Sequence, residues 1–561
     1  MSDSHFDAVV VGSGFGGSVM AYRLAEAGLS VCVLERGKAY KPGSYPRAPH
    51  ELARNFWDPA AGLYGMFHLW QFKHLNALVS SGLGGGSLIY ANVLIRKDEA
   101  WFADEGATEG TYEPWPVSRA DLDPHYDEVE KQIGLEVYPA HLAASTPKTR
   151  AYAAAAARAG LDHACLPLAV TFSRPGQTPG EPVVPLDTDN LHGQTRTTCR
   201  LCGECDVGCN YGSKNTLDLT YLSQAKKRGA EIRTGADVRA FRALPKGGWA
   251  VDYIDQSLQD GVPVDKAKRL TLTAGQLILA AGTLGSTHLM LRNRGNLKGQ
   301  LPKLGSRFCG NGDILGMAVL AKDEAGTFRE LAPNRGPVIT SRVRLPDALD
   351  GPGAKGRGAY IEDAGFPVFL NWVAESFSAV RKGGRAWGFV WELLKRTLGL
   401  SHDTDFSREF SRLISGNELT MASLPMLGMG RDVPDGLLHL NEGGRLDSTW
   451  NVKTSAAFFD RVRDHMKILS HQMGAKFQDN PLWWFKRLVT VHPLGGCPMG
   501  RHAQEGVVDD HGEVFENPGL FVADGAVMPG PVGPNPSLTI AALADRFANR
   551  VIANHKKGIS A

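Results

Sequence analysis

The sequence predicts an α/β fold, α+β overall, in which a Rossmann-like domain is combined with a discontinuous second domain built on a mixed or antiparallel sheet with helices. Two observations predict the first domain: a strand, glycine-rich turn, helix and strand at residues 6–35, and a buried strand that ends at a glycine at 277–283. A third predicts the second domain, because 561 residues are too many for one ordinary hydrophobic core.

The first element is a βαβ unit. Asp7–Val11 reads as a strand, an Ala/Leu-rich helix runs to about Ala27, and Val31–Glu35 reads as the second strand. The glycine turn lets backbone approach a pyrophosphate, and an acid that ends the second strand can accept hydrogen bonds from ribose hydroxyls. The expected dinucleotide contacts are Gly12, Gly14, Phe15, Gly16, Gly17, Glu35 and Arg36. The alternative is an ordinary glycine turn with a solvated Glu35.

A second glycine run follows at residues 82–87. Its glycines would let backbone pack tightly against another part of a long cofactor, and the alternative is a tight turn alone. The contacts expected here are Gly84, Gly85, Gly86, Ser87 and Asn92. Between the two glycine runs, the aromatic-rich residues 40–75 have the composition of a lid or pocket-lining loop rather than of a regular element.

The remaining elements divide the chain into two discontinuous domains. Short β-like segments run from Glu231 to Thr283, mixed strands and helices follow from about 300 to 480, and the chain returns to the first domain after Pro493. We expect the nucleotide domain at 1–100, 215–300 and 480–561. The substrate-binding or cap domain is expected at 100–215 and 300–480, and it includes a cysteine-rich segment at 199–209.

Composition excludes several classes of protein. The 61 basic and 59 acidic residues give a formal charge of +2, so no global field attracts nucleic acid. The polar N-terminus lacks the basic start and long apolar stretch of a secretory signal, and no run approaches the roughly 18 apolar residues of a spanning helix. We therefore expect a cytoplasmic protein without nucleic-acid partners.

Two motifs near the C-terminus add a catalytic pattern. They are HPLGG, which begins at His492, and NPSLT, which begins at Asn535, and a strand that ends in Asp524-Gly525 lies between them. Together with the two glycine runs, this order resembles the glucose-methanol-choline (GMC) oxidoreductases, and most of all their cholesterol oxidase branch. The resemblance covers roughly 1–100 and 480–555, with 277–282 between, and the middle of the chain is less diagnostic.

The resemblance implies FAD as cofactor and transfer of a hydride from an alcohol carbon to flavin N5. His492 matches the family histidine that takes the hydroxyl proton, which suits imidazole because its ordinary pKa is about 6.5. Asn535 matches the asparagine that holds the substrate oxygen or polarises the flavin, and the last helix is expected to begin just after it. Further cofactor contacts are expected at Val238, Gly282, Asp524, Gly525, Pro536 and Ser537. A hydrogen-bonded structural histidine is the alternative for His492.

Glu362 is a third catalytic candidate. Many cholesterol oxidases also use a glutamate as base, and Glu362 lies in the corresponding region, although the residues around it match the family poorly. A solvated loop acid is the alternative, so the resemblance by itself leaves the role of Glu362 open.

Four cysteines form a compact cluster with the spacing C-x2-C-x2-C-x3-C. They are Cys199, Cys202, Cys205 and Cys209. This is the spacing of bacterial iron–sulfur ferredoxins, except that Asn210 stands where a proline usually follows. The cysteines are therefore candidate ligands of a [4Fe–4S] or [3Fe–4S] cluster, and the alternatives are reduced thiols or a zinc knuckle. A cluster would give reduced flavin an electron exit other than oxygen.

The substrate expected from composition is a hydrophobic alcohol. The aromatic residues of 57–72 favour an apolar pocket, and a basic amphipathic helix expected at 385–400 would lie on a membrane surface, pack on the core or form a dimer interface. We thus expect an FAD-dependent enzyme that converts a sterol-like or long-chain alcohol to a ketone or aldehyde, in the cytoplasm or peripheral to the inner membrane. Its electrons pass to O2 or, through a cluster, to another acceptor. The alternative is a flavin-bearing lyase of the hydroxynitrile lyase type.

Overall fold

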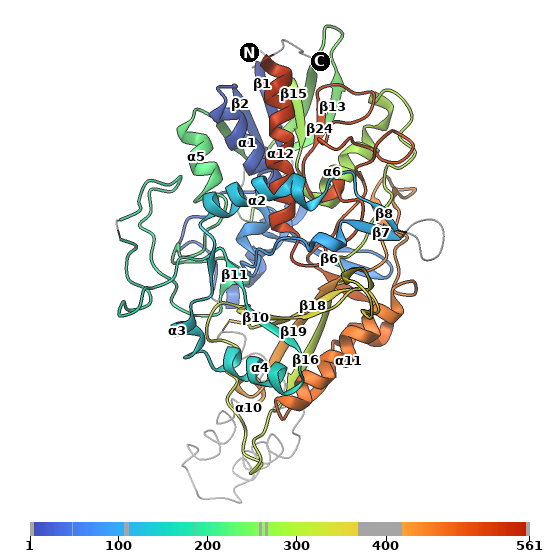
Figure 1. Cartoon of the computed structure of the whole chain (residues 1–561). Helices are drawn as coiled ribbons and strands as arrows, with labels where there is room; N and C mark the ends of the chain where they lie inside the picture. Colours follow the sequence, from blue (N-terminus) through green and yellow to red (C-terminus); the bar gives the residue numbers. More distant parts are fainter. Residues whose placement is uncertain are drawn as a thin grey trace, which may run out of the picture.

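The computed structural model describes residues 5–47, 49–105, 112–184, 186–256, 261–263, 268–367 and 418–556. Two large sheets lie one above the other in the view of Figure 1. The amphipathic helix expected at 385–400 lies outside the described residues. Among the helices that are described, none combines the length and the apolar character needed to cross a membrane.

The upper sheet has seven strands and contains the predicted βαβ unit. In spatial order its strands are β12 (Glu231–Thr234), β2 (Val31–Glu35), β1 (His5–Val11), β15 (Lys268–Leu279), β14 (Trp249–Asp255) and β13 (Ala236–Ala243), while β24 (Leu520–Val522) also pairs with β15. Strands β12, β2, β1, β15 and β24 are parallel, and β14 and β13 are antiparallel. Parallel strands are buried on both faces, which explains the continuous apolar runs that the sequence shows there.

Helices from both ends of the chain cover the upper sheet. They are α1 (Phe15–Glu26), α2 (Arg119–Ile133), α5 (Tyr221–Lys227), α6 (Gly282–Arg292) and α12 (Ser537–Lys556). Helix α12 packs on α1 and α2, and an ion pair between Arg23 and Asp545 joins α1 to α12. Figure 1 shows α12, in red, beside the N-terminal strand β1. The last helix begins at Ser537, where the sequence predicts it.

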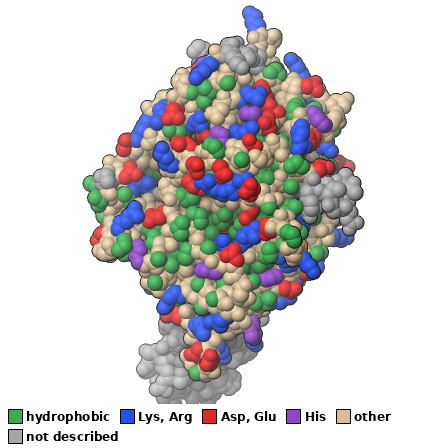
Figure 2. All heavy atoms as spheres, in the orientation of Figure 1, with side chains coloured by type: hydrophobic (Ala, Val, Ile, Leu, Met, Phe, Trp, Pro, Cys, Tyr) green, Lys and Arg blue, Asp and Glu red, His purple; other side chains and the backbone are tan. Residues whose placement is uncertain are grey.

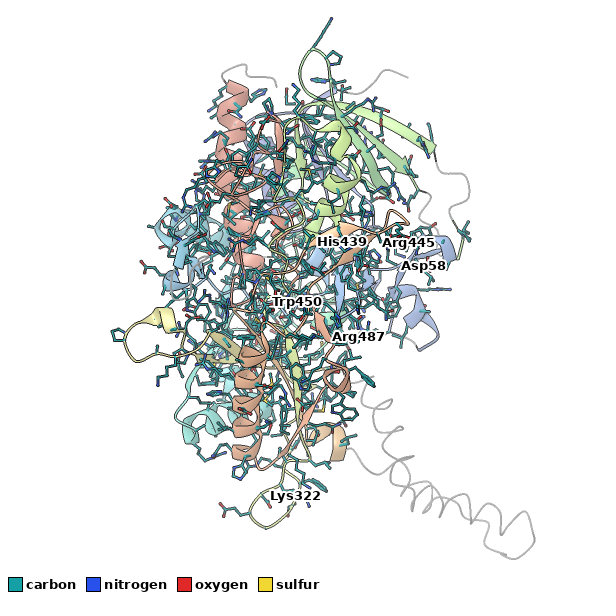
Figure 3. All side chains as sticks on the ribbon, turned by 90° about the vertical axis from the view of Figure 1, so that its right-hand side faces the viewer. Asp58, Lys322, His439, Arg445, Trp450 and Arg487 are labelled. Carbon is teal, nitrogen blue, oxygen red and sulfur yellow. The ribbon has the colours of Figure 1, made fainter. Side chains whose placement is uncertain are left out.

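The lower sheet has six strands, all antiparallel. In spatial order they are β10 (Asp162–Cys165), β17 (Ser341–Leu345), β18 (Ala359–Asp363), β19 (Leu424–Gly430), β16 (Ile314–Val319) and β22 (Lys476–Asp479). Helices α4 (Pro147–Arg158) and α11 (Ala456–Gln472) pack against it. Trp450 is buried in its core, and Lys322 lies at the opposite end of the molecule from the upper sheet (Figure 3). The two sheets together confirm the predicted fold class.

Small sheets connect the two large ones. They are β5 (Phe67–Gln71) with β6 (Leu75–Ser80) and β23 (Leu488–Thr490), β3 (Trp57–Asp58) with β4 (Leu63–Tyr64), β7 (Ala103–Glu105) with β8 (Tyr112–Pro114), β9 (Glu136–Val137) with β11 (Pro167–Leu168), and β20 (Leu438–Leu440) with β21 (Leu446–Ser448). Two further short α-helices are described, α3 (Ala140–Ala143) and α10 (Glu418–Met421). The expectation of an irregular loop at 40–75 is wrong for β3, β4 and β5, because aromatic residues there pair across strands.

The molecular surface carries charges of both signs. Figure 2 shows acidic and basic side chains interspersed over the face on which α2 lies, without a field of one sign. The formal charge of +2 predicts this mixture.

Candidate active site

A cavity of about 960 Å³ brings together residues from both large sheets. Most of the cofactor contacts predicted from sequence line it, together with two of the three catalytic candidates. They are Gly12, Gly14, Phe15, Gly16, Glu35, Arg36, Gly85, Gly86, Val238, Gly282, Asp524, Gly525, Pro536 and Ser537, with His492 and Asn535. Its volume lies at the upper end of the range of about 300–1,000 Å³ that is common for small-molecule sites.

The first glycine turn presents bare backbone to this cavity. A Cβ at Gly16 would lie 1.5 Å from the carbonyl oxygen of Ala523, so the turn packs directly against the chain that follows β24. A Cβ at Gly14 would meet nothing within 4 Å, and Gly14 lines the cavity. The backbone at Gly14, just ahead of the N-terminus of α1, is therefore open to an anionic group, and a pyrophosphate fits this position.

Glu35 is tied to both glycine runs. Its Oε2 accepts from the backbone N–H of Ser13 at 3.1 Å and from the Ser13 hydroxyl at 2.6 Å, and its Oε1 accepts from Gly37 N–H at 2.8 Å. The Ser13 hydroxyl oxygen also accepts from Gly84 N–H at 3.0 Å. Burial raises the pKa of Glu35, while the hydrogen bonds from Ser13 act in the opposite direction. The acid therefore holds the two runs together as well as facing the cavity.

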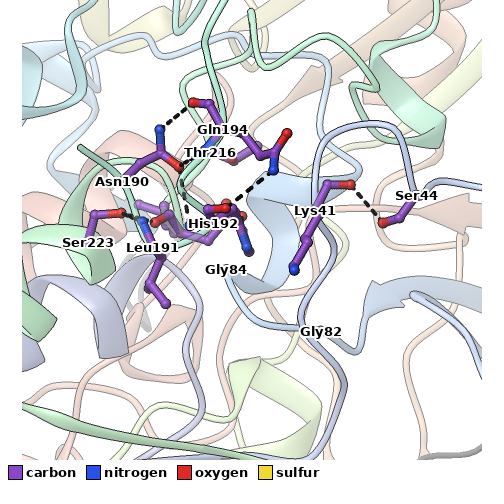
Figure 4. A network of polar contacts seen from close by, with 12 residues as sticks. Lys41, Ser44, Gly82, Gly84, Asn190, Leu191, His192, Gln194, Thr216 and Ser223 are labelled. Atoms are coloured by element: carbon purple, nitrogen blue, oxygen red, sulfur yellow. Dashed lines mark hydrogen bonds and ion pairs between the residues drawn. The ribbon is translucent and has the colours of Figure 1, made fainter. Parts of the chain in front are cut away.

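Hydrogen bonds of the Ser87 hydroxyl hold the second glycine run in place. Ser87 Oγ donates to the Gly84 carbonyl at 2.7 Å, and it accepts from Leu217 N–H at 3.0 Å. Asp218 lies beside Gly84, where its Oδ1 would be 3.4 Å from a Cβ, and it bonds to His192 at 2.6 Å. His192 belongs to a turn at 190–194 in which Asn190 Nδ2 donates to the Gln194 carbonyl (Figure 4). Gly84 and Ser87 thus shape the run, whereas Gly85 and Gly86 reach the cavity.

At the Glu35 end of the cavity, Arg36 supplies a partly buried cation. Its guanidinium lies 5.2 Å from the centre of the Trp57 ring and donates to His68 Nδ1 at 2.9 Å. Burial, and then the charge of Arg36, lower the pKa of His68 to about 3, so this imidazole is neutral and can accept. Trp57 and His68 also line the cavity, and both come from the aromatic segment that the sequence marks as pocket-lining.

His492 is held by one carboxylate. Its Nδ1 lies 2.8 Å from Asp313 Oδ1, and Asp313 Oδ2 accepts from the Thr490 hydroxyl at 2.9 Å and from the backbone N–H groups of Val491 and His492 at 2.8 and 3.2 Å. Because a carboxylate only accepts, Nδ1 carries the proton and the neutral ring keeps a lone pair on Nε2. Nε2 has no hydrogen-bond partner among the described residues, and His492 lines the cavity.

Asn535 is positioned by the same turn that carries Asp313. Asn311 donates through Nδ2 to the carbonyls of Gly533 and Pro534 at 3.3 and 3.1 Å, and its Oδ1 accepts from Gly533 N–H at 2.9 Å. The Oδ1 of Asn535 is buried and lacks a partner in the described chain, which costs about 1–3 kcal/mol unless a ligand supplies a donor. Residues 311–313 therefore fix both catalytic candidates, and Asn535 fits a bound donor.

Glu362 lies behind this pair rather than in the cavity wall. It is fully buried in β18, opposite Leu427 of β19. Its carboxyl lies against the Asn535 amide, which favours the ionised form, but neither oxygen makes a hydrogen bond of ordinary geometry with a described residue. Burial dominates and raises the pKa of Glu362 well above its usual value. Glu362 is therefore not the solvated loop acid that the sequence left open.

Asp524 lines the cavity shortly after the end of strand β24. It accepts from Ala526 N–H at 2.8 Å and from the Ser286 hydroxyl at the start of α6. Burial raises the pKa of Asp524 to about 6, and the two hydrogen bonds oppose that rise. Its place beside Gly525 keeps one carboxyl group within reach of a cofactor hydroxyl.

Some predicted residues lie elsewhere, and some residues of the site carry no motif. Gly17, Gly84, Ser87, Asn92 and Glu362 are not in the cavity wall. A Cβ at Gly17 would lie 2.1 Å from the Gly12 carbonyl oxygen, so Gly17 serves the packing of helix on turn, as expected from its position. Sequence reasoning missed Asn311 and Asp313, because they stand almost 180 positions before His492 in a region without a recognisable pattern.

The four clustered cysteines line a second, much smaller cavity. It has a volume of about 20 Å³, the room of roughly one water molecule, and Asn92 also lines it with both amide atoms buried and without a described partner. Leu201 N–H lies 3.4 Å from Cys199 Sγ. The four cysteines thus line one small cavity.

The sulfur positions do not suit a single zinc ion. Within the described chain, no three of these sulfurs lie within 4.8 Å of one another, whereas tetrahedral zinc needs sulfurs about 3.8 Å apart. Burial raises the pKa of Cys202 to about 12 and also raises those of Cys199 and Cys205, so the free thiols are protonated at neutral pH. The zinc knuckle is the alternative that this geometry disfavours.

Comparison with solved structures supports the fold. A pyridoxine 4-oxidase from Mesorbium loti is 16% identical, with a TM-score of 0.57 over 97% of this chain and 98% of that one. A formate oxidase from Aspergillus oryzae is 13% identical, with a TM-score of 0.57 over 99% and 100%.

Comparison with known sequences gives the family. Two models described as GMC oxidoreductase match residues 186–309 and 482–544, and an NAD(P)-binding Rossmann-like model matches 10–41. The chain is 30% identical over 569 residues to a cholesterol oxidase of Mycobacterium tuberculosis, which covers 97% of this chain and 90% of that protein. A cholesterol oxidase of Acinetobacter baumannii is 27% identical over 571 residues (98% and 95%), and a long-chain-alcohol oxidase of Arabidopsis thaliana is 24% identical over 555 residues (97% and 67%). The chain belongs to the GMC oxidoreductase family and is an FAD-dependent oxidoreductase.

Proposed function

We propose that the protein oxidises the CH–OH group of a hydrophobic alcohol, sterol-like or long-chain, to a ketone or an aldehyde. Bound FAD supplies the hydride acceptor, flavin N5. The observation that carries the proposal is the pairing of His492 Nδ1 with Asp313 at 2.8 Å, which leaves Nε2 as the acceptor on the side of the cavity. The names of the relatives from M. tuberculosis and A. thaliana support the substrate class.

Side chains of the protein accept the hydroxyl proton of the alcohol and stabilise the charge that results. His492 Nε2 accepts the hydroxyl proton of the alcohol, and the adjacent Asp313 carboxylate stabilises the imidazolium that results. Asn535 would donate through its amide Nδ2 to the alcohol oxygen, or to the carbonyl oxygen that forms from it, while its buried Oδ1, which lacks a described partner, would accept from a bound donor. Glu362 lies behind Asn535, and because burial raises its pKa well above the usual value, its proposed role is that of a protonated carboxyl that acts through the Asn535 amide rather than that of a second base.

We infer the contacts of FAD from the residues that line the cavity. Gly14 and the N-terminus of α1 would receive the pyrophosphate, and Glu35 would accept from a ribose hydroxyl. Asp524 would accept from the ribityl chain, and Val238 and Gly282 would contact the remaining surface of FAD. Asn92 is proposed as a contact of the cysteine cavity instead, since it faces that cavity.

The test is flavin reduction without oxygen. Purified enzyme, saturated with FAD, is mixed anaerobically with a 3β-hydroxysteroid or with a long-chain primary alcohol, and the flavin absorbance is followed. We expect bleaching in wild type with at least one of them. A flavin that stays oxidised with every alcohol overturns the proposal, and cleavage of a cyanohydrin without bleaching would instead support the lyase alternative.

The cysteine segment supports a second proposal, about the electron exit. The specific observation is that Asp206 and Val207, between Cys205 and Cys209, line the main cavity, so the cysteine cavity lies directly behind its wall. An iron–sulfur cluster on the four cysteines would receive electrons there, and without one the acceptor is O2. Such clusters are bound by cysteine thiolates, so the four thiols are the matching donor set.

The cluster proposal has its own test. Protein purified without oxygen is assayed for iron and acid-labile sulfide, in wild type, in Cys205→Ser and in the matched control Cys165→Ser, which lies outside the cluster. We expect iron and sulfide in wild type and in the control but not in Cys205→Ser. Wild type without iron contradicts the cluster and leaves alcohol oxidation untouched.

A further inference from the structure

Part of the main cavity wall is apolar. Residues from the loop after Cys205 and from the lower sheet and its neighbouring loops form it: Val207, Val338, Ile339, Ala364, Pro425 and Leu427. Such a surface contacts a hydrocarbon skeleton but gives it no fixed orientation, because apolar contact is not directional. A polar group in this wall would therefore decide how a substrate lies.

Asp206 is a carboxylate in this wall. It lines the cavity beside Val207, and its Oδ1 is buried without a hydrogen-bond partner among the described residues. A buried carboxylate oxygen without a donor is unfavourable, and a ligand that brings a donor removes that cost. The position is thus an acceptor that the protein leaves unsatisfied inside the same cavity as His492 and Asn535.

Two buried lysines stand near Asp206 without pairing to it. Lys214 donates to the carbonyls of Leu88, Tyr90 and Cys205 at 3.1, 2.7 and 2.9 Å. Lys148 donates to the carbonyl of Val338 and lies 3.7 Å from Asp363 Oδ2. Within the described chain, neither ammonium group forms an ion pair with Asp206 at 4.0 Å or less.

The charges around Asp206 determine which kind of hydrogen-bond donor a ligand can bring to its free oxygen. A second cation, such as a substrate amine, would be repelled by the two lysines, and an anion would be repelled by Asp206 itself. A neutral hydroxyl can donate to the free oxygen without adding charge to the buried site. The favoured ligand group is therefore an O–H.

We propose that Asp206 recognises a second hydroxyl group of the substrate, so that the preferred substrate is a diol with an apolar skeleton. This inference rests on the proposed alcohol oxidation: one hydroxyl reacts at His492 and Asn535, and the other donates to Asp206. The substrate is thereby oriented along the apolar wall.

The experiment compares pairs of substrates that differ only in the second hydroxyl. The pairs are androst-5-en-3β-ol with androst-5-ene-3β,17β-diol, and 1-decanol with 1,10-decanediol. For each, kcat/KM is measured in wild type, in Asp206→Leu, in Asp206→Asn and in the neighbouring control Val207→Ala. Flavin content and thermal melting are recorded for every variant.

We expect wild type to prefer the diol of at least one pair by about tenfold or more, because a site built for a hydroxyl rejects the analogue that lacks it. Asp206→Leu removes this preference through loss on the diol alone, and Asp206→Asn, which keeps an acceptor oxygen, retains part of it. Val207→Ala changes both members of a pair by the same factor.

The results that would overturn the inference differ from the result that would overturn the proposed function. If wild type oxidises the members of both pairs equally well, the inference is overturned and the proposed function stands. If Asp206→Leu and Asp206→Asn lower both members equally, or neither variant folds with flavin, Asp206 is structural and the inference is also overturned. If wild type reduces its flavin with none of the four alcohols, it is the proposed function that fails.

Discussion

His492 and the clustered cysteines occupy neighbouring cavities that differ in how their functional atoms are held. The imidazole is fixed by Asp313, which itself accepts from Thr490 and two backbone N–H groups. The four cysteine side chains surround about 20 Å³. Backbone N–H groups contact three of the four sulfurs: Leu201 contacts Cys199, Glu204 contacts Cys202, and Val338 contacts Cys205. The first site holds its imidazole through a network around one carboxylate, whereas the second holds three of its thiols through single backbone contacts.

This difference shows that the geometry supports the proposal of alcohol oxidation more directly than the proposal of an iron–sulfur cluster. A proton acceptor works only in a fixed orientation, so the hydrogen bonds around His492 are evidence for its role. Metal ligands are often ordered by the metal itself, so the positions of these thiols are compatible with cluster binding but do not argue for it. Alcohol oxidation therefore has support in the structure that the cluster lacks.

The largest effect is expected for His492→Ala. Loss of the proton acceptor should slow flavin reduction by about 10²- to 10⁴-fold, while FAD stays bound because the glycine turns are untouched. Anaerobic stopped-flow reduction with the best alcohol measures the rate, and the flavin-to-protein absorbance ratio is the control. A variant with full activity and full flavin content would show that His492 is structural.

A smaller loss is expected for Asp313→Asn. The amide keeps the size of the carboxylate but offers only one acceptor oxygen to four donors, so the ring is misplaced and flavin reduction falls by about 10- to 100-fold.

A double-mutant cycle separates positioning from general damage. In the His492→Ala background, Asp313→Asn should cause no further loss in the rate of flavin reduction, because its effect passes through the imidazole. Additive losses in the two backgrounds would contradict this.

Glu362→Gln should change stability in a pH-dependent way. Because burial raises the folded-state pKa of Glu362 above its ordinary value, the stability that the protonated carboxyl contributes is present at low pH and is lost as pH rises through the window between the two values. Replacement by an uncharged amide removes that loss.

Thermal melting at pH 5 and pH 8 measures the effect. The Tm of Glu362→Gln relative to wild type should be higher at pH 8 than at pH 5. An equal difference in Tm between variant and wild type at both pH values would show that burial does not raise the pKa of Glu362 in the folded protein.

The smallest effect is expected for Cys202→Ser. If the cysteine cavity serves only the electron exit, anaerobic flavin reduction by alcohol should keep its wild-type rate, and only reoxidation by the physiological acceptor or a dye should change. The Cys165→Ser variant is the matched control. A slower reduction in Cys202→Ser alone would mean that the cysteine segment shapes the catalytic cavity itself.

Local sequence determined much of the nucleotide site. Gly12, Gly14 and Gly16 follow a strand and begin a helix, and Glu35 ends the next strand, all within 24 residues. Such short-range patterns are readable because backbone sterics and strand–turn–helix geometry operate over a few residues. The structure places these residues in one cavity wall, and their contact with a cofactor stays a prediction.

Other features depended on contacts distant in sequence. Asn92 looked like a cofactor contact from its position after the glycine run, yet it faces the cysteine cavity. Asn92 has a positive φ of 70°, which redirects the chain there, and neighbouring residues alone do not reveal such a turn.

The sequence by itself determined the fold class and the dinucleotide turn, and it pointed to the two side chains that we propose to face the alcohol, because each resides in a short motif. Only the tertiary structure decided what makes those side chains competent. It brings Asn311 and Asp313 beside residues more than 170 positions away, buries Glu362 behind Asn535, and leaves Asp206 unpaired in an apolar wall. The physical reason is that hydrogen bonding and burial depend on which strands pack together, and that pairing is set by the whole core rather than by any one segment.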